Sequence, residues 1–360
     1  MTCPEGVGSG TTKGLHIGLN VATIDNGDRP IPKDTQGNFV FAFWVSPNIR
    51  LVPIGELDLW KNPQHWNGKD LIVQKVEIGT AYKLVVRVRN TDVTYRRNIT
   101  LEAWVADLNA GSGSAAAIRR FPNSTTDRSK VSFKTDLIHS AQEVPPQNPA
   151  DPDDPTKMAV LVGRETWTPN AEQLQYNGGH TCLIANVYTE GSSDERIAAT
   201  PSEGEPLGIG DVRPYCDRRH GQLNLDIVYR TVGTTETRTV MVGVPATDRC
   251  TLEGEVALKA VQLTQGEPQL AGLATHAGLT SHHCPDDPME TVTIDDDGDP
   301  SHELGICLEP GENIPVALTI APYDGEKPGD IYAFDMITTD ESNDSIYGAA
   351  RFFVLVTDPA

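Results

Sequence analysis

Apolar and polar residues alternate along most of this chain in short runs, which Gly, Pro, Asn and Asp interrupt at short intervals. The clearest run is YKLVVRVRN, residues 82–90. Because successive residues of a strand point to opposite faces, this run predicts one apolar face, formed by Leu84, Val86 and Val88. The other face, with Lys83, Val85, Arg87 and Arg89, is predicted to meet water. Helical spacing of apolar residues is nearly absent, so the pattern predicts an all-β protein of antiparallel sandwiches.

Two series of strand-like runs divide the chain. The first includes NITLEAWVADL, residues 98–108, which we expect to pair with residues 82–90 as a hairpin, and it ends with HGQLNLDIVYRTV, residues 220–232. The second series begins near Thr234 and reaches the last residues. A chain of 360 residues exceeds one ordinary core. We therefore expect three parts, namely an N-terminal arm with one strand (1–36), a sandwich with a long Pro-rich insertion (37–230) and a second sandwich (231–360).

The N-terminal arm contains a strand pattern in TTKGLHIGLNVATIDNG, residues 11–27. Its apolar face is formed by Leu15, Ile17, Leu19 and Val21. Such a strand needs a sheet to lie on. It either covers an edge of the first sandwich within the same chain, which we favour, or completes the sheet of a neighbouring copy by strand addition. The second arrangement would propagate head to tail into a filament.

The order of these segments resembles tandem bacterial immunoglobulin-like modules of the CARDB kind. In the first half the resemblance lies in SPNIRLV, VEIGTAYKLVVRVRNT, NITLEAWVADL and GGHTCLIANVYTE, and in the second half in LEPGENIPVALTIAP and KPGDIYAFDMITTD. The resemblance implies two immunoglobulin-like antiparallel β-sandwiches. It also implies a non-catalytic role in adhesion, spacing, substrate binding or assembly, although fold alone does not establish a role.

The formal net charge of −21 limits the partners of the chain. Nucleic acids and anionic membranes attract basic surfaces, so we expect neither as a partner. No apolar run reaches the length of about eighteen residues that insertion into a membrane requires. The first residues, MTCPEGVGSGTTKG, contain no signal peptide in the chain as given. The resemblance nevertheless leads us to expect an extracellular or cell-surface location.

Two His/Cys pairs suggest metal chemistry. His180 and Cys182 stand two apart on a predicted strand, and Cys216 and His220 follow downstream. A zinc site, a disulfide between Cys182 and Cys216, and plain packing are the three interpretations. Structural zinc is typical of small folds that cannot form without it, whereas these strands belong to a sandwich with an adequate core. We therefore favour packing of Cys182 in a buried strand.

The second half contains one long acidic run with an Asp-x-Asp-x-Asp pattern at Asp295, Asp297 and Asp299. Such carboxylates can bind calcium. An EF-hand would require Gly and Glu where this chain has Pro300 and Ile306, so a helix–loop–helix site is excluded. A calcium loop of another kind and a solvated acidic turn both remain open.

The sequence contains six cysteines, an even number that is compatible with disulfides and also with free thiols. Cys284 and Cys307 flank the acidic run. A disulfide between them would close the loop, and we name this pair as the candidate.

Two tryptophans lie in the polar, turn-like segment LDLWKNPQHWNG. Trp60 and Trp66 are either exposed aromatics that stack on a sugar or contact a partner protein, or caps of one end of the sandwich. They are the candidate binding residues.

No motif for a nucleophile elbow, a zinc protease, a phosphate loop or a dinucleotide site is present in the sequence. We therefore expect a non-enzymatic protein without a cofactor, calcium being the one candidate. The leading hypothesis is a subunit of a surface or secreted assembly, such as a filament, appendage or phage-like particle, which acts through protein–protein contacts including self-association. The alternatives are a carbohydrate-binding accessory module that binds glycan, and a hydrolase with a site built from loops.

Overall fold

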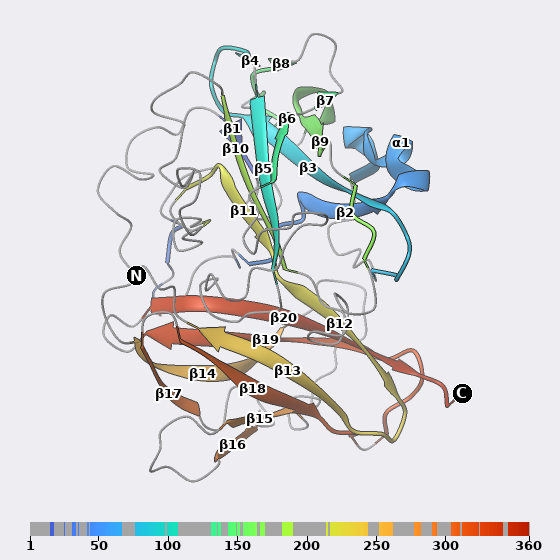
Figure 1. The fold of residues 1–360 in the computed structure, drawn as a ribbon, viewed down its shortest axis with the longest axis vertical. Helices are drawn as coiled ribbons and strands as arrows, with labels where there is room; N and C mark the ends of the chain where they lie inside the picture. The colour runs from blue at the N-terminus through green and yellow to red at the C-terminus, as the bar shows by residue number, and fades with distance from the viewer. Residues whose placement is uncertain are drawn as a thin grey trace.

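The computed structural model describes residues 15–17, 25, 31–33, 35, 42, 44–66, 76–97, 99–106, 131–134, 136–137, 143–148, 150–151, 154–163, 166–169, 182–189, 214, 217–243, 252–261, 277–281, 290–293, 304–309, 312–323, 325–340 and 345–359. These residues form two bodies of β-sheet, one above the other in Figure 1. The strands up to residue 223 lie in the upper body, and those from residue 225 onward lie in the lower body.

The upper body is a sandwich of two sheets. The first sheet has the order β1–β3–β9–β7, with β2 also paired to β3, and comprises β1 (Leu15–His16), β2 (Ile49–Pro53), β3 (Tyr82–Asn90), β7 (Asp136–Leu137) and β9 (Ala159–Val162). The second has the order β11–β10–β5–β6 and comprises β5 (Ile99–Ala106), β6 (Val131–Lys134), β10 (Cys182–Thr189) and β11 (His220–Leu223). A short ladder joins β4 (Arg96–Arg97) to β8 (Glu143–Val144).

The predicted hairpin between residues 82–90 and 98–108 is wrong, because β3 and β5 lie in different sheets. Leu84 and Val86 of β3 and Leu101 of β5 belong to the same buried core, which they enter from opposite sides. The segment between the two strands therefore crosses from one sheet to the other. Local alternation predicted the buried face of each strand but not its pairing partner.

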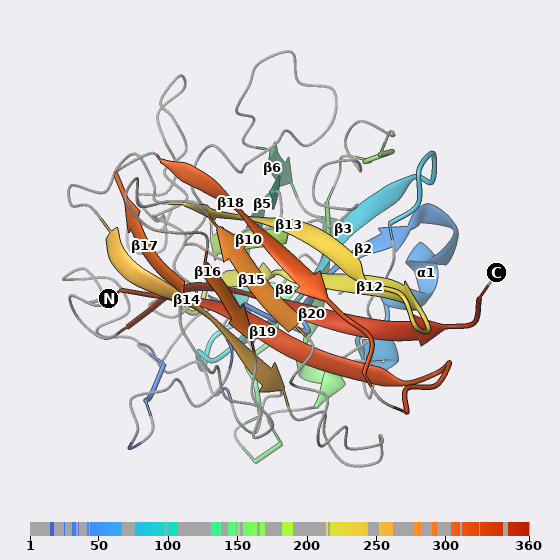
Figure 2. The same ribbon diagram turned by 90° about the horizontal axis from the view of Figure 1, so that it is seen from below.

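The lower body is a second sandwich, seen from below in Figure 2. One sheet has the order β12–β20–β19–β14–β17 and comprises β12 (Leu225–Thr231), β14 (Leu252–Val261), β17 (Leu304–Leu308), β19 (Ile331–Asp340) and β20 (Ser345–Thr357). The other has the order β13–β18–β15–β16 and comprises β13 (Glu236–Gly243), β15 (Ala277–Ser281), β16 (Glu290–Thr293) and β18 (Asn313–Ile320). Apolar residues of both sheets, including Val240, Leu258, Leu318 and Phe352, form one buried core.

Successive strands of the lower body cross repeatedly between its two sheets, as in immunoglobulin-like sandwiches, while β15 and β16 stay in one sheet and β19 and β20 in the other. Thus β12 pairs with β20 in one sheet, while β13 pairs with β18 in the other. Gly233, with φ of 75°, allows the tight turn between β12 and β13. The predicted all-β, immunoglobulin-like architecture is confirmed.

The segment HGQLNLDIVYRTV does not form one strand of the first sandwich. It is divided at Asn224 into β11, which pairs with β10 above, and β12, which pairs with β20 below. The predicted boundary between residues 230 and 231 falls within β12, before its last residue, Thr231. How the chain divides into independently folding domains stays a prediction.

Helical structure is short and is confined to the upper body in the described part of the chain. It comprises η1 (Ile54–Glu56), α1 (Leu57–Trp60), η2 (Pro63–Trp66) and η3 (Pro155–Lys157). Among the residues that the structure describes, no helix has the length and apolar character needed to cross a membrane.

Candidate functional site

Trp60 and Trp66 are buried, which agrees with the interpretation that they cap the sandwich and not with the one that exposes them for binding. Their exposed fractions are 5% and 1%. The two rings meet edge to face with centroids 5.3 Å apart, and Nε1 of Trp66 donates to the Trp60 carbonyl over 2.8 Å. An indole so placed has no face for a sugar. Their segment instead folds back over the outer side of the first sheet.

The outer side of β3, predicted to meet water, is therefore covered. Val85, Trp60 and Trp66 belong to a second, smaller apolar cluster on this side. The guanidinium carbon of Arg50 lies 4.6 Å from the centroid of the Trp60 ring, and that of Arg87 lies 5.3 Å from the Trp66 ring. Both arginines are buried. The aliphatic part of an arginine side chain packs on aromatic rings, and its charge is attracted to the ring face. Arginines at alternate positions of β3 therefore do not make its outer face solvent-exposed.

Part of the N-terminal arm lies in the chain's own first sheet. β1 pairs with the end of β3, where Leu15 is opposite Asn90, and the N–H of Ile17 donates to the Arg218 carbonyl over 2.8 Å. Leu15 and Ile17 are fully buried in the upper core. A Cβ atom on Gly221 would lie 2.6 Å from Ile17 Cγ2, so glycine provides the space in which β1 lies. Leu19 and Val21 are outside the described residues.

Most of the predicted metal and disulfide residues also lie outside the described residues. These are His180, Cys216, Cys284, Asp295, Asp297 and Asp299. Cys182 begins β10, His220 is buried at the start of β11, and Cys307 is exposed on β17. In the described part of the chain, no group of three or more His, Cys, Asp or Glu side chains could hold a metal. The zinc, calcium and disulfide hypotheses therefore stay predictions.

His220 takes part in a polar turn rather than in a site with those residues. Its N–H donates to the Asp217 carbonyl, and the Arg219 guanidinium donates to the Asp217 carboxylate over 2.7 and 3.0 Å. Burial raises the pKa of Asp217, but the charges of His220 and Arg219 and the hydrogen bonds from Arg219 outweigh it and hold that pKa well below its ordinary value. Asp217 is thus an anion that fixes the turn before β11.

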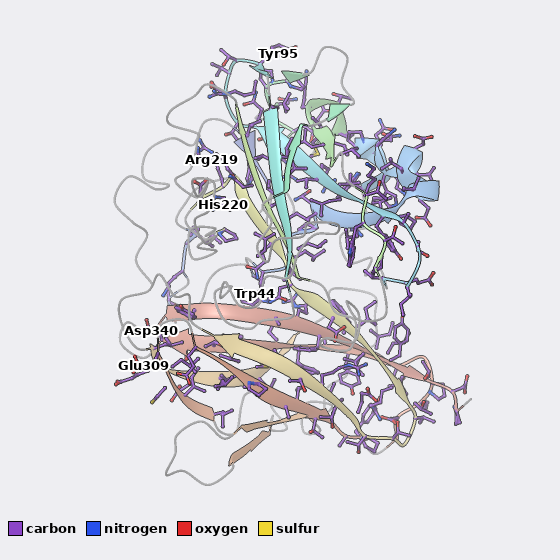
Figure 3. All side chains as sticks on the ribbon, viewed as in Figure 1. Trp44, Tyr95, Arg219, His220, Glu309 and Asp340 are labelled. Carbon is purple, nitrogen blue, oxygen red and sulfur yellow. The ribbon has the colours of Figure 1, made fainter. Side chains whose placement is uncertain are left out.

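Asn224, a fully buried residue between β11 and β12, hydrogen-bonds to residues of both sandwiches. Its backbone N–H donates to the Trp44 carbonyl over 2.7 Å, and its carbonyl accepts from the Arg351 N–H over 3.0 Å. Its side-chain Nδ2 donates to the Ala349 carbonyl of β20 over 2.7 Å. Figure 3 shows Trp44 at the level where the two bodies meet. One residue therefore hydrogen-bonds to both sandwiches.

A loop at the far end of the upper body, residues 91–95, is held from within; Figure 3 shows its Tyr95 opposite the lower body. The buried Asn90 side chain donates to the Thr94 carbonyl over 2.7 Å and accepts from the Asp92 N–H over 3.0 Å. Asp92 accepts from the Val93 N–H and from Arg96, each over 2.6 Å. We call residues 91–95 the tip loop.

The electrostatics of the tip loop favour its observed conformation. Burial raises the pKa of Asp92, but the hydrogen bond from the Val93 N–H and the charge of Arg96 outweigh it and lower that pKa below its ordinary value. Asp92 is therefore ionised at neutral pH and keeps Arg96 beside it.

The lower body contains a buried ion pair between Arg230 of β12 and Glu326 of the loop before β19. Both side chains are at most 2% exposed. Arg230 also donates to the Thr234 carbonyl over 2.8 Å, and the Gly233 N–H donates to Glu326 over 2.6 Å. The pair thus holds the β12–β13 turn against the β18–β19 loop.

Glu326→Gln should lower the free energy of unfolding by about 3 kcal/mol, because it leaves the Arg230 charge buried without its carboxylate. Glu236→Gln is the matched control: its pair with Arg238 is partly exposed, so a loss below about 1 kcal/mol is expected. Urea denaturation at pH 7 measures both. Equal losses would show that the buried pair has no special weight.

The same pair predicts a pH dependence. Burial raises the pKa of Glu326, but the hydrogen bonds from Arg230 and Gly233 outweigh it and lower that pKa below the ordinary 4.5. A lowered folded-state pKa stabilises the fold above pH 4.5, and this stabilisation is lost as the pH falls through the folded-state value. Glu326→Gln should therefore flatten the acid limb of the stability profile.

Comparison with known proteins gives weak structural similarity only. No protein-family model matches the sequence, and no curated protein matches it. Among solved structures, the CupB6 tip adhesin from Pseudomonas aeruginosa is 14% identical over 79% of this chain and 94% of its own, with a TM-score of 0.19. The teleost fish polymeric Ig receptor ectodomain is 11% identical over 79% of this chain and 95% of its own, with a TM-score of 0.18.

A family 123 glycoside hydrolase from Clostridium perfringens is also similar, at 14% identity and a TM-score of 0.26. The similarity covers 38% of this chain and only 24% of the hydrolase. Its activity therefore does not carry over to this chain.

Sequence reasoning missed both Asn224 and the tip loop. The sequence carries no signal for the first, because Asn224 stands at a regular polar position of the alternation in QLNLDIV. The signal for the second is the segment NTDVTY, where Asn and Asp stand two apart, as is typical of side chains that cap turns. This signal does not indicate by itself which residues are exposed.

Proposed function

We propose that this chain is a non-catalytic structural protein that acts by protein–protein contact, as a subunit of a surface or secreted assembly at an extracellular or cell-surface location. The observation that supports this proposal is the junction at Asn224. A chain that transmits force or presents its two ends at a fixed spacing requires sandwiches joined without a flexible linker. Three hydrogen bonds from one buried residue meet that requirement.

We also propose that the two sandwiches are modules of the CARDB kind, in keeping with the strand order that the sequence resembles. The carbohydrate-binding alternative has lost the observation that favoured it, because Trp60 and Trp66 are buried.

Light scattering and electron microscopy of the purified full chain test the proposed function. Regular particles or filaments would support it, and so would a stable complex with a second protein from the same cell surface. A monomer that instead turns over a substrate from a panel of glycosides and esters would contradict it and favour the hydrolase.

Asn224→Ala should loosen the junction. The substitution removes the donor to the buried Ala349 carbonyl, which costs about 1–3 kcal/mol. We expect the small-angle scattering profile to change from that of one rigid particle to that of two bodies in variable orientation. Asn148→Ala is the control, because its side chain bonds only within an exposed loop in the described structure. An unchanged scattering profile for Asn224→Ala would contradict a junction fixed by this side chain.

A further inference from the structure

We propose that the tip loop is the contact by which this chain binds another protein, one that offers an apolar pocket within a basic surface. The proposal rests on the proposed function and names its contact surface and the chemistry of its partner. Val93 is 77% exposed and Tyr95 is 56% exposed, and Figure 3 shows Tyr95 at the end of the upper body that faces away from the lower body.

The tip loop presents these side chains in a fixed conformation. Its turn is held by the Asn90 and Asp92 side chains, and its base is held by the pairing of β4 with β8 and by the Asn90 side chain, which also donates to the Val144 carbonyl over 3.0 Å. Binding through a flexible loop costs free energy to order that loop. Here the internal hydrogen bonds order the loop during folding, so binding does not have to order it. Exposed apolar side chains on such a loop are suited to recognition.

The shape of the tip loop selects the kind of partner. Glycan and small-molecule sites are concave, with the ligand largely surrounded. Val93 and Tyr95 instead project from the end of a sandwich, so the concave surface must belong to the partner. Two side chains bury far less area than the roughly 800 Å² per partner of a stable interface, so a symmetric contact between two tip loops is too small. A protein that encloses the loop in a pocket provides the missing area.

Charge defines the surface around that pocket. The chain has 50 acidic and 29 basic residues, and its net charge of −21 repels an acidic partner. The charge of Asp92 in the tip loop is compensated by Arg96 at the start of β4, with their atoms 2.6 Å apart. The apolar contact is therefore locally neutral, while the rest of the chain attracts a basic surface. Electrostatic complementarity of this kind speeds association and weakens with salt.

Crosslinking at position 95 identifies the partner. Tyr95→p-benzoylphenylalanine is expressed in the cells that make the protein, with the same photoreactive residue at Ile78 as the control, since Ile78 is 61% exposed on a turn elsewhere in the upper body. A basic protein crosslinked from position 95 and not from position 78 is the expected result. No crosslink above the Ile78 background, or an acidic protein, would overturn the proposal.

Binding of that purified protein to the full chain is then measured by calorimetry at low and high salt. Tyr95→Ser should weaken it by about thirtyfold and Val93→Ser by less, as for a central aromatic contact and its neighbour, while Ile78→Ser should leave it unchanged. High salt should weaken the binding of the wild type, because it screens the attraction between the acidic chain and the basic surface. Equal affinity for wild type and Tyr95→Ser would overturn the tip loop as the contact while leaving a structural role intact. Binding to a glycan array that depends on Tyr95 would overturn the choice of a protein partner.

Discussion

Trp66→Ala should lower the free energy of unfolding of the upper sandwich by about 4 kcal/mol, the loss typical of a buried tryptophan. Trp66 fills the space between Trp60, Arg87 and the outer face of β3. Its removal leaves a cavity there and removes the hydrogen bond to the Trp60 carbonyl. It also exposes the arginines that now lie against the rings.

Leu59→Ala is the matched control, because Leu59 lies on α1 beside Trp60 but is 57% exposed. A change within about 0.5 kcal/mol is expected for it. Urea denaturation followed by tryptophan fluorescence measures both variants. A loss below about 1 kcal/mol for Trp66→Ala would mean that the segment covering the outer face contributes little, and a surface role for the tryptophans would have to be considered again.

The strands themselves could be predicted because alternation is a local signal. Leu84, Val86 and Val88 are fully buried, as their spacing indicates. Sheet membership could not be predicted in the same way. β3 pairs with β9 and β5 pairs with β10, and both partners are distant in the sequence. These pairings place β3 and β5 in different sheets. Register and partner are fixed by the buried faces of several strands together.

The outer face of β3 shows a second limit of sequence reasoning. Arg87 and Arg89 stand at alternate positions that predict a solvent-exposed face, but both are buried. A guanidinium can be buried when rings and hydrogen-bond acceptors surround it, and Arg87 donates from Nε to the Asn48 side chain over 2.6 Å. The residues that cover it come from another part of the chain. Alternation therefore predicted the inner face of β3 but not the segment with Trp60 and Trp66 that covers its outer face.

The candidate sites were harder to predict than the fold, for a related reason. A site depends on exposure, and exposure depends on what packs against a segment. Trp60 and Trp66 stand among polar residues in the sequence and are buried, whereas Val93 and Tyr95 stand next to an apolar strand and are exposed. The hydrogen bonds of Asn90 and Asp92 decide the second case, because they stabilise a turn that projects outward.

Deletion of residues 1–27 should unfold the upper sandwich. The deletion removes Leu15 and Ile17, two fully buried side chains whose loss costs about 2–5 kcal/mol each, and leaves the edge of β3 beside Asn90 without its partner strand. Domain stabilities are of the order of 5–15 kcal/mol, so few sandwiches tolerate such a loss. Loss of the upper-body transition in circular dichroism melts is the expected observation.

Deletion of residues 1–12, which keeps β1, is the control and should leave the melt unchanged. The deletion of residues 1–27 also decides between the two arrangements of the arm. If β1 belongs to its own chain, the wild type requires no polymer for stability, and the deletion gives an unfolded or aggregated upper body. If β1 completes a neighbour's sheet, the wild type is polymeric and the same deletion abolishes the polymer, because it removes the strand that links neighbouring copies. That second result would contradict the pairing of Leu15 with the Asn90 position of the same chain.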